Sequence, residues 1–220
     1  MKCKATAKNN DKNECRVKVL MLGWELPPHH TGGLGVVCYQ MCKELAKHGA
    51  DIEFILPYTA DYSDIDFMKV TAAHAQDVES VTMAGGIYDS QLYRHEYTDG
   101  TIEHLDLRMQ QDQFVSNVCK LVPLAEFDVI HAHDWLTMRA AMAAKQLSGK
   151  PMIVHIHATE YDRSAGEYGN PLVRDIEYFG MMMADKVIAV SDYVKKVLVS
   201  EYSIPAEKID IVHNLSLIHI

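Results

Sequence analysis

Residues 17–49 read VKVLMLGWELPPHHTGGLGVVCYQMCKELAKHG and carry the clearest indication of the fold. This stretch begins with a nearly continuous apolar run, Val17–Leu22, which is typical of a strand buried on both faces of a parallel sheet. A Pro-Pro bend follows, and the glycine-rich turn Thr31–Gly35 then opens into a segment with apolar residues at helical spacing. Gly49 fits the C-terminal cap of that helix. Strand, glycine turn and helix predict the first half of a β-α-β unit.

The glycines at 32, 33 and 35 allow two interpretations. Without a Cβ the backbone can approach a ligand closely, and a helix N-terminus adds partial positive charge. The turn would therefore favour binding of an anion such as a phosphate. Alternatively, the glycines only let the helix pack against the strand. The spacing matches neither G-x-G-x-x-G nor a Walker A loop, so the pattern alone leaves both interpretations open.

Composition limits the possible partners. The chain has 220 residues, of which 48% are hydrophobic and 23% charged, which describes an ordinary globular protein of one large or two small domains. A formal charge of −9 argues against nucleic acid or an anionic membrane as partner, although one phosphorylated ligand remains compatible with it. No apolar run approaches the roughly 18 residues of a membrane span. The five cysteines are an odd number without a C-x-x-C motif, and we expect no signal peptide and a cytoplasmic location.

The rest of the chain alternates between strand and helix patterns. Apolar runs predict strands at 52–56, 128–133, 152–157, 186–190 and 209–212. Helical patterns occupy 112–126, 136–147, 171–183 and 191–202, the last one capped by Ser191. The region 58–99 is weaker, with β-like pieces at 78–83 and 91–97 and a hairpin turn at Asp99-Gly100 that leads into a strand at 101–107. The alternation predicts an α/β fold, a Rossmann-like doubly wound and mainly parallel sheet with helices on both faces.

Polar residues gather where three predicted strands end, and ligands bind at that edge of such sheets. His131 and His133 share one face of a strand, as do His155 and His157, because side chains alternate along a strand. We expect His131 and His155, which lie deeper, to be buried and hydrogen-bonded to backbone.

We expect His133, Asp134 and His157 to face a ligand at the rim, where they suit the hydroxyl groups of a sugar. A His-x-His motif followed by Asp134 also resembles metallohydrolase sites, but no further His or Asp follows at close spacing and no Cys lies nearby. We therefore predict no metal and no cofactor, and metal analysis tests the metallohydrolase alternative.

Five segments together resemble a known family. GWELPPHHTGGLG, VIHAHDW, IVHIHATEYDRSAGEYGNP, ADKVIAVSDYVKKVL and YSIPAEKIDIVHN follow one another between Val17 and Asn214. They are similar to the N-terminal, acceptor-side domain of a GT-B glycosyltransferase of the retaining type related to glycogen and starch synthases. The resemblance implies transfer of a sugar, glucose by the family's pattern, from a nucleotide-sugar donor such as ADP-glucose or UDP-glucose to a glycan acceptor.

The resemblance also assigns roles to individual residues. His157 would hydrogen-bond the transferred sugar, as a donor when charge develops, and Asp134 would help line the same pocket; these two are the candidate catalytic residues. The candidate substrate-binding residues are Gly32, Gly33, His133, Glu160, Tyr161 and Asn214. Glycogen synthases of the bacterial type carry a lysine just before the glycines, whereas this chain has His30.

The end of the chain departs from the family. The family continues after the equivalent of Asn214 with a hinge and a second domain that holds most of the donor, whereas this sequence reads Leu215–Ile220. We therefore expect a disordered tail at 1–15, an N-terminal GT-B domain at 16–214 and an atypical tail at 215–220, in a fragment that is inactive alone. The alternative is a stand-alone Rossmann-like module that binds a glycan or a nucleotide.

Overall fold

A seven-stranded parallel sheet forms the centre of the part of the chain that the computed structural model describes, residues 16–29, 32–84 and 92–214. Its strand order is β10-β9-β8-β7-β1-β2-β3, and every neighbouring pair is parallel. The strands are β1 (Lys18–Leu22), β2 (Asp51–Leu56), β3 (Lys69–Ala72), β7 (Val129–His133), β8 (Met152–Ile156), β9 (Lys186–Ala189) and β10 (Ile209–Ile211). The expected α/β fold with a mainly parallel sheet is confirmed.

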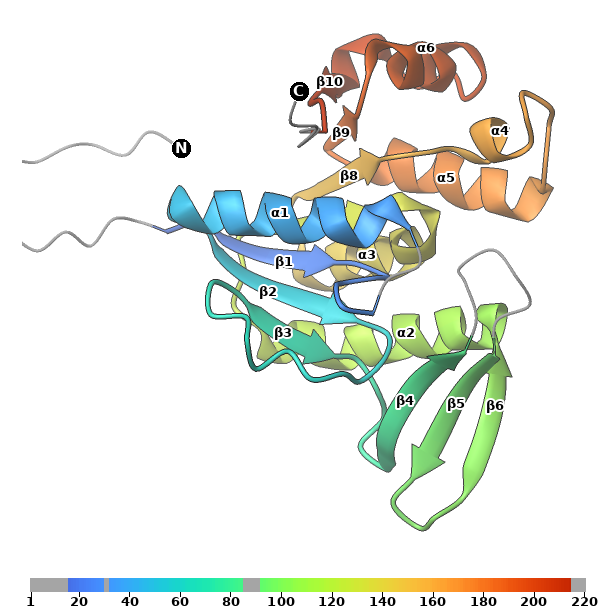
Figure 1. Cartoon of the computed structure of the whole chain (residues 1–220). Helices are drawn as coiled ribbons and strands as arrows, with labels where there is room; N and C mark the ends of the chain where they lie inside the picture. The colour runs from blue at the N-terminus through green and yellow to red at the C-terminus, as the bar shows by residue number, and fades with distance from the viewer. Residues whose placement is uncertain (1–15, 30–31, 85–91, 215–220) are drawn as a thin grey trace, which may run out of the picture.

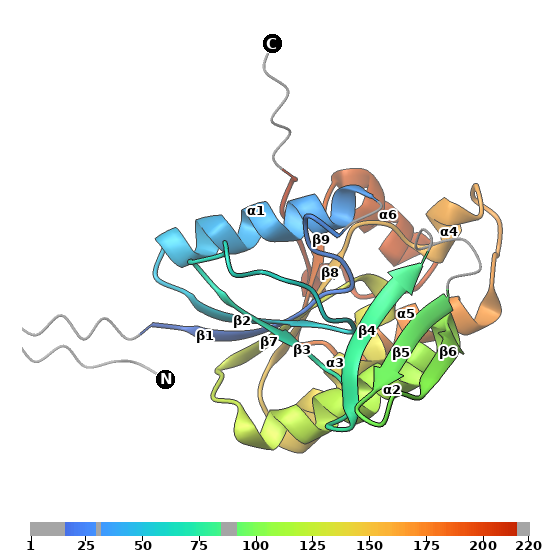
Figure 2. The same ribbon diagram turned by 60° about the horizontal axis from the view of Figure 1, so that its bottom comes forward.

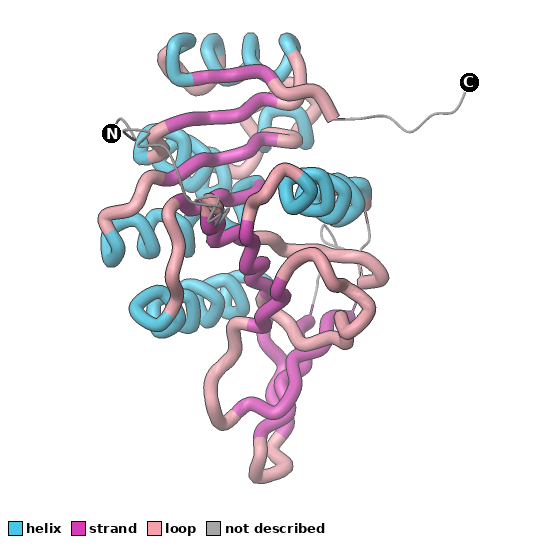
Figure 3. The backbone as a smooth tube through the Cα atoms, turned by 90° about the vertical axis from the view of Figure 1, so that its left-hand side faces the viewer, coloured by secondary structure: helices cyan, strands magenta, loops and turns pink. Residues whose placement is uncertain are grey.

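Helices cover both faces of this sheet. Helix α1 (Gly33–Lys47) lies on one face, and α2 (Leu107–Leu121) and α3 (Asp134–Ser148) lie on the other (Figure 1, Figure 2). Helix α5 (Pro171–Met183) packs against α3 and β8, while α6 (Asp192–Ser200) packs against β9 and β10. Short helical turns complete the chain: α4 (Glu160–Arg163), η1 (Val122–Leu124) and η2 (Ala206–Lys208). In the side view the strands lie one above another with helices to either side (Figure 3).

A small antiparallel sheet projects from the β2–β3 side of the molecule (Figure 1). It consists of β4 (Val78–Ala84), β5 (Leu92–Tyr97) and β6 (Ile102–Asp106), and the predicted turn at Asp99-Gly100 joins β5 to β6. Its anchor is Tyr93, whose hydroxyl accepts a hydrogen bond of 2.9 Å from the indole Nε1 of Trp24, just beyond β1. Both rings are buried, so the small sheet is fixed to the edge where β1 ends.

Most elements lie where the sequence predicts them, with four differences. Helix α2 begins at Leu107 rather than at 112, because Asp106 caps it by accepting a hydrogen bond from the backbone N of Met109. Helix α3 begins directly at Asp134, and Thr159 with Asp162 forms a capping box that starts α4 inside a segment expected to be irregular. Strand β3 was not predicted. The expected tails at 1–15 and 215–220 lie outside the described residues.

Candidate functional site

The N-terminus of α1 opens to solvent at the edge where β1 ends. Gly32 is the N-cap with extended backbone and Gly33 is the first helical residue, and both are exposed. A Cβ added to either glycine would meet nothing within 4 Å, so packing of the helix does not require glycine there. Tight packing instead explains Gly23, where a Cβ would lie 2.2 Å from the Phe54 ring. The open helix end favours the interpretation that a ligand approaches the backbone N–H groups.

Beside it, four histidines form an imidazole cluster on the face of the sheet that α1 covers. The cluster consists of His131 and His133 from β7, His155 from β8 and His157 just beyond β8. The rings of His155 and His157 stack with centroids 4.4 Å apart, and those of His131 and His133 with centroids 4.7 Å apart. Strand alternation and the parallel register of β7 with β8 bring all four together, as the sequence predicts.

One hydrogen bond links two rings of the cluster. His133 Nδ1 lies 3.1 Å from His157 Nε2, and His133 Nε2 lies 3.1 Å from the sulfur of Met21. His133 is 0% exposed, so the expectation that it faces a ligand at the rim was wrong. The depth of this position comes from α1, which brings Cys38 within 4.8 Å of the ring nitrogens of His133 and His157. His157, half-buried, is the histidine that comes nearest the surface.

The deeper histidines differ from expectation as well. Nε2 of His131 and both ring nitrogens of His155 are buried without a hydrogen-bond partner among the described residues, so the expected bonds to backbone are not made. Burial lowers the pKa of His131 and of His155 to about 3, and that of His157 to about 4. Burial also lowers the pKa of His133 well below its usual value. All four rings are therefore neutral at pH 7, which lets them stack without charge repulsion.

The cluster offers ligand atoms that a metal ion could bind. Two groups have ligand atoms within 4.8 Å of one another: Cys38 with His133 and His157, and His131 with His133 and His155. An imidazole binds a metal through a lone pair in its ring plane, so rings that share an ion need planes that converge on it. The rings of His131 and His155 are only 11° from parallel, an arrangement that suits stacking better than coordination. The absence of a metal stays a prediction.

Asp134 lies behind His157 and holds its backbone. Its Oδ1 accepts a hydrogen bond of 2.7 Å from the backbone N of His157, and the residue is only 6% exposed, so the expectation that Asp134 faces a ligand at the rim was wrong as well. It has a left-handed backbone conformation, φ +53°, which is uncommon for a residue other than glycine, although aspartate adopts it more readily than most. Burial raises the pKa of this carboxyl to about 6, although hydrogen bonds from the backbone and the nearby Arg163 oppose the shift.

A second polar cluster, the guanidinium network, lies on the other side of the β8 end and consists of Arg163, Glu160, Glu177 and Tyr202. Arg163 donates to Glu177 Oε1 at 2.6 Å and to Glu160 Oε2 at 3.1 Å. The hydroxyl of Tyr202 donates to Glu177 Oε2 at 2.5 Å. Burial opposes the charge on Arg163, but the carboxylates of Glu177, Asp134 and Glu160 outweigh it and raise the pKa of the guanidinium.

The remaining candidate residues have different surroundings. Glu160 is engaged within the protein, since its second carboxylate oxygen accepts from the backbone N of Asn170 at 2.9 Å. Tyr161 is half-buried and packs against the core, and Asn214 is exposed at the end of the described chain. The structure thus brings Gly32, Gly33, His133, Asp134 and His157 to one edge, while Glu160 has a structural role in the loop that follows β8.

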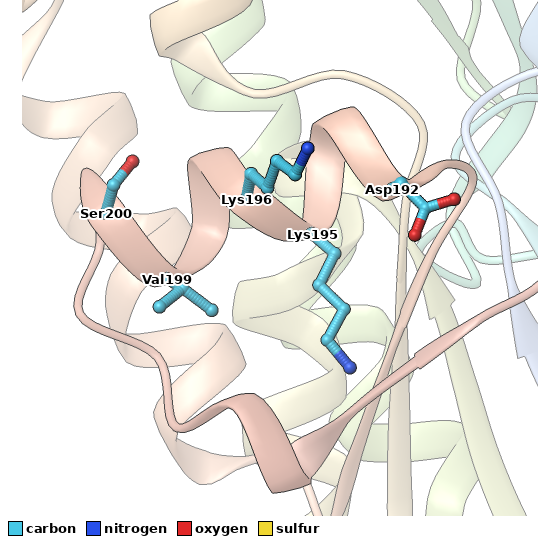
Figure 4. A pocket seen from close by; sticks show the side chains of 5 residues that line it. All are labelled: Asp192, Lys195, Lys196, Val199 and Ser200. Atoms are coloured by element: carbon cyan, nitrogen blue, oxygen red, sulfur yellow. The ribbon is translucent and has the colours of Figure 1, made fainter.

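A shallow hollow along α6 is separate from this site. Its lining residues are Asp192, Lys195, Lys196, Val199 and Ser200, whose side chains spread along the helix and do not converge on one point (Figure 4). The Nζ of Lys195 already donates to the carbonyl oxygen of Ile209 at 2.6 Å. The clustered polar groups of the strand edge therefore have no counterpart among the residues that line this hollow.

Several residues of the site could not be found from sequence reasoning. Met21 and Cys38 read as core residues, and Glu177 as one polar residue of helix 171–183. The sequence held one indication of the guanidinium network, the opposite charges of Glu160 and Arg163 three residues apart. By the family resemblance, Glu160 was expected in a loop.

Comparison with known proteins decides the family. Residues 31–215 match the model of Glycosyltransferase Family 4. The chain belongs to this family. It is 30% identical over 168 residues to a glycogen synthase of Mycobacterium tuberculosis, covering 73% of this chain and 38% of that protein.

Two solved structures share the fold. Sucrose-phosphate synthase from Thermosynechococcus elongatus has a TM-score of 0.66 at 12% identity and covers 90% of this chain and 48% of that chain. The catalytic domain of Starch Synthase IV from Arabidopsis thaliana, bound to ADP and acarbose, has a TM-score of 0.53 at 17% identity and covers 90% of this chain and 52% of that chain. The match confirms a GT-B glycosyltransferase domain similar to glycogen and starch synthases.

The chain spans less than half the length of the curated relatives it matches. Within the described residues, no helix has the length and apolar character needed to cross a membrane.

Proposed function

We propose that this chain is the acceptor-side half of a retaining glycosyltransferase that transfers glucose from a nucleotide sugar to an α-glucan or related glycan. The observation that carries the proposal is the convergence, at one edge of a family 4 domain, of an open helix N-terminus with the His157–Asp134 pair. The N–H groups at Gly32 and Gly33 suit a phosphate or an anionic part of the donor. His157 suits the transferred sugar, and Asp134 holds the backbone of His157 in place beside it.

The nucleotide-sugar donor and the second domain belong to the same proposal. Homologous proteins such as the glycogen synthase are more than twice as long as the matched region, which supports a partner domain that holds the nucleotide. In the intact enzyme, fixed dipoles at the strand edge would stabilise the departing nucleoside diphosphate and the positively charged sugar of the transition state. The 220-residue chain alone would then fold without useful turnover.

A donor screen tests the proposal. The complete reading frame is incubated with ADP-glucose or UDP-glucose and a malto-oligosaccharide, and nucleoside diphosphate release is measured together with the anomeric configuration of the product. We expect release that depends on the glycan, and an α-linked product from an α-linked donor. A folded, full-length protein that binds glycan but releases nucleoside diphosphate from no donor would support the stand-alone binding module instead.

A further inference from the structure

The hydrogen bond between His133 and His157 raises the question of which ring carries the hydrogen. Nδ1 of His133 and Nε2 of His157 are 3.1 Å apart, so one of them donates and the other accepts. Two lone pairs or two N–H groups at this distance would repel each other. The distance alone does not show which nitrogen donates. The answer determines whether His157 presents an N–H group or a lone pair to a ligand.

Met21 removes this ambiguity. Its sulfur lies 3.1 Å from the other nitrogen of His133, Nε2, in a place where both residues are 0% exposed. A thioether sulfur has lone pairs and no hydrogen to donate. Nε2 of His133 must therefore carry the hydrogen that points at the sulfur. Because burial keeps this imidazole neutral, it holds a single N–H, and its Nδ1 is left with a lone pair.

The tautomer of His133 determines the tautomer of His157. Its Nε2 must donate to the lone pair on His133 Nδ1, and the neutral ring then has a lone pair at its own Nδ1. That Nδ1 is not among the buried nitrogens without a partner, and no hydrogen bond from another described residue reaches it. It is thus the nitrogen of the His133–His157 pair that is left for a ligand.

We propose that Met21 and His133 act as positioning residues that hold His157 as its Nε2–H tautomer, so that His157 meets its ligand as a hydrogen-bond acceptor. On the proposed function, on which this last step rests, the ligand group is a sugar hydroxyl that donates to His157 Nδ1. A phosphate oxygen, which only accepts, is repelled by the same lone pair. The phosphate is thereby left to the N–H groups at the start of α1, and the two parts of the site bind different parts of the donor.

Nitrogen NMR on the 220-residue chain tests the tautomer without any ligand. Ring-15N-labelled histidine and two-bond 1H–15N correlation distinguish a nitrogen that carries hydrogen from one that does not. His133→Gln and His157→Gln variants assign the two spin systems among the twelve histidines. At pH 7 we expect hydrogen on Nε2 and none on Nδ1 in both residues.

A matched pair of variants tests the part played by the sulfur. Met21→Leu removes the acceptor with little change of volume, and Met152→Leu makes the same change at a second fully buried methionine on the opposite face of β8. We expect the tautomer ratio of His133 to shift about fivefold in Met21→Leu, the effect of one ordinary hydrogen bond, and not in Met152→Leu.

Three results would overturn the proposal: hydrogen on Nδ1 of His157, two hydrogens on either ring at pH 7, or a tautomer ratio unchanged by Met21→Leu. Each is read from the chain without donor or acceptor. The proposed function can fail separately, because it is tested by nucleoside diphosphate release.

Discussion

The two polar clusters that meet at the end of β8 differ in how they are satisfied. The guanidinium network consists of charged groups, and its central Arg163 and Glu177 both have partners at hydrogen-bond distance. The imidazole cluster consists of neutral rings, with three buried nitrogens that have no partner among the described residues. Asp134 lies between the two, bonded to the backbone of His157 and near Arg163.

This difference separates scaffold from site. A buried charge is tolerated only when it is paired, so the guanidinium network fixes the loop after β8 and has little capacity left for a ligand. Unpartnered buried polar groups cost stability and are expected mainly where function requires them. We infer that the guanidinium network stabilises the fold. The imidazole cluster contacts the ligand through His157. Variants in each cluster test this difference.

The largest effect is expected for Glu177→Ala, which leaves Arg163 with a buried charge and removes the acceptor of Tyr202. The free energy of unfolding should fall by about 3–5 kcal/mol. Denaturant unfolding measures it, with Glu167→Ala, an exposed glutamate in the loop before α5, as control. A loss below about 1 kcal/mol for Glu177→Ala would mean that the network is not a scaffold.

The second effect concerns activity rather than stability. In the complete enzyme, His157→Ala should lower kcat by about 10²-fold or more, the scale of a lost transition-state hydrogen bond. The fold should be kept, with the free energy of unfolding lowered by about 1–3 kcal/mol because the buried Nδ1 of His133 loses its partner. Initial rates and thermal melting are measured together, with the exposed His104→Ala of β6 as control. Turnover at the wild-type rate would remove His157 from the catalytic residues.

Acid should destabilise the imidazole cluster. His131, His155 and His157 have folded-state pKa values of about 3, 3 and 4, below the usual 6.5, so between these values the unfolded chain binds protons that the folded chain does not. Proton uptake by the unfolded state therefore lowers the free energy of unfolding as the pH falls below 6.5. Asp134, with its pKa raised to about 6, opposes this, because between pH 4 and 6 the folded state holds its proton.

Four histidines, since the pKa of His133 is also lowered, outweigh one carboxyl, so the net free energy of unfolding should fall on going from pH 7 to pH 5, by about 2 kcal/mol per pH unit or more. Thermal melting across this range measures the slope. A melting temperature that stays constant or rises toward pH 5 would contradict the neutral, buried state of the rings.

The smallest effect is expected for His155→Leu. Neither nitrogen of His155 has a partner, so an apolar side chain of similar size should change the free energy of unfolding at pH 7 by less than about 1 kcal/mol and could increase it. The same variant should make the acid slope shallower. If His155→Leu instead costs several kcal/mol at pH 7, the ring has hydrogen bonds that the cluster as described lacks.

The sequence was sufficient for the parallel sheet because its strands are long apolar runs buried on both faces. It missed β3, whose four residues are only partly buried and carry no such pattern. It also began α2 too late, because residues 101–107 alternate like a strand and conceal the cap at Asp106.

For the site, strand alternation correctly placed four histidines on one face but gave no measure of depth. His133 is buried because α1 lies over it, and its ring is oriented by Met21, 112 residues away in the chain. Such contacts depend on tertiary packing and leave no local pattern. The donor role that the sequence suggested for His157 is likewise replaced, in our proposal, by an acceptor role that only the packed arrangement reveals.

The proposal that this chain is one half of a catalytic unit is tested by comparing the complete reading frame with the 220-residue chain in one assay of nucleoside diphosphate release, using ADP-glucose and UDP-glucose with a malto-oligosaccharide. We predict release by the complete protein and none above background by the chain, although both are folded. Release at the same rate by the 220-residue chain would contradict the claim that it is one half of the catalytic unit.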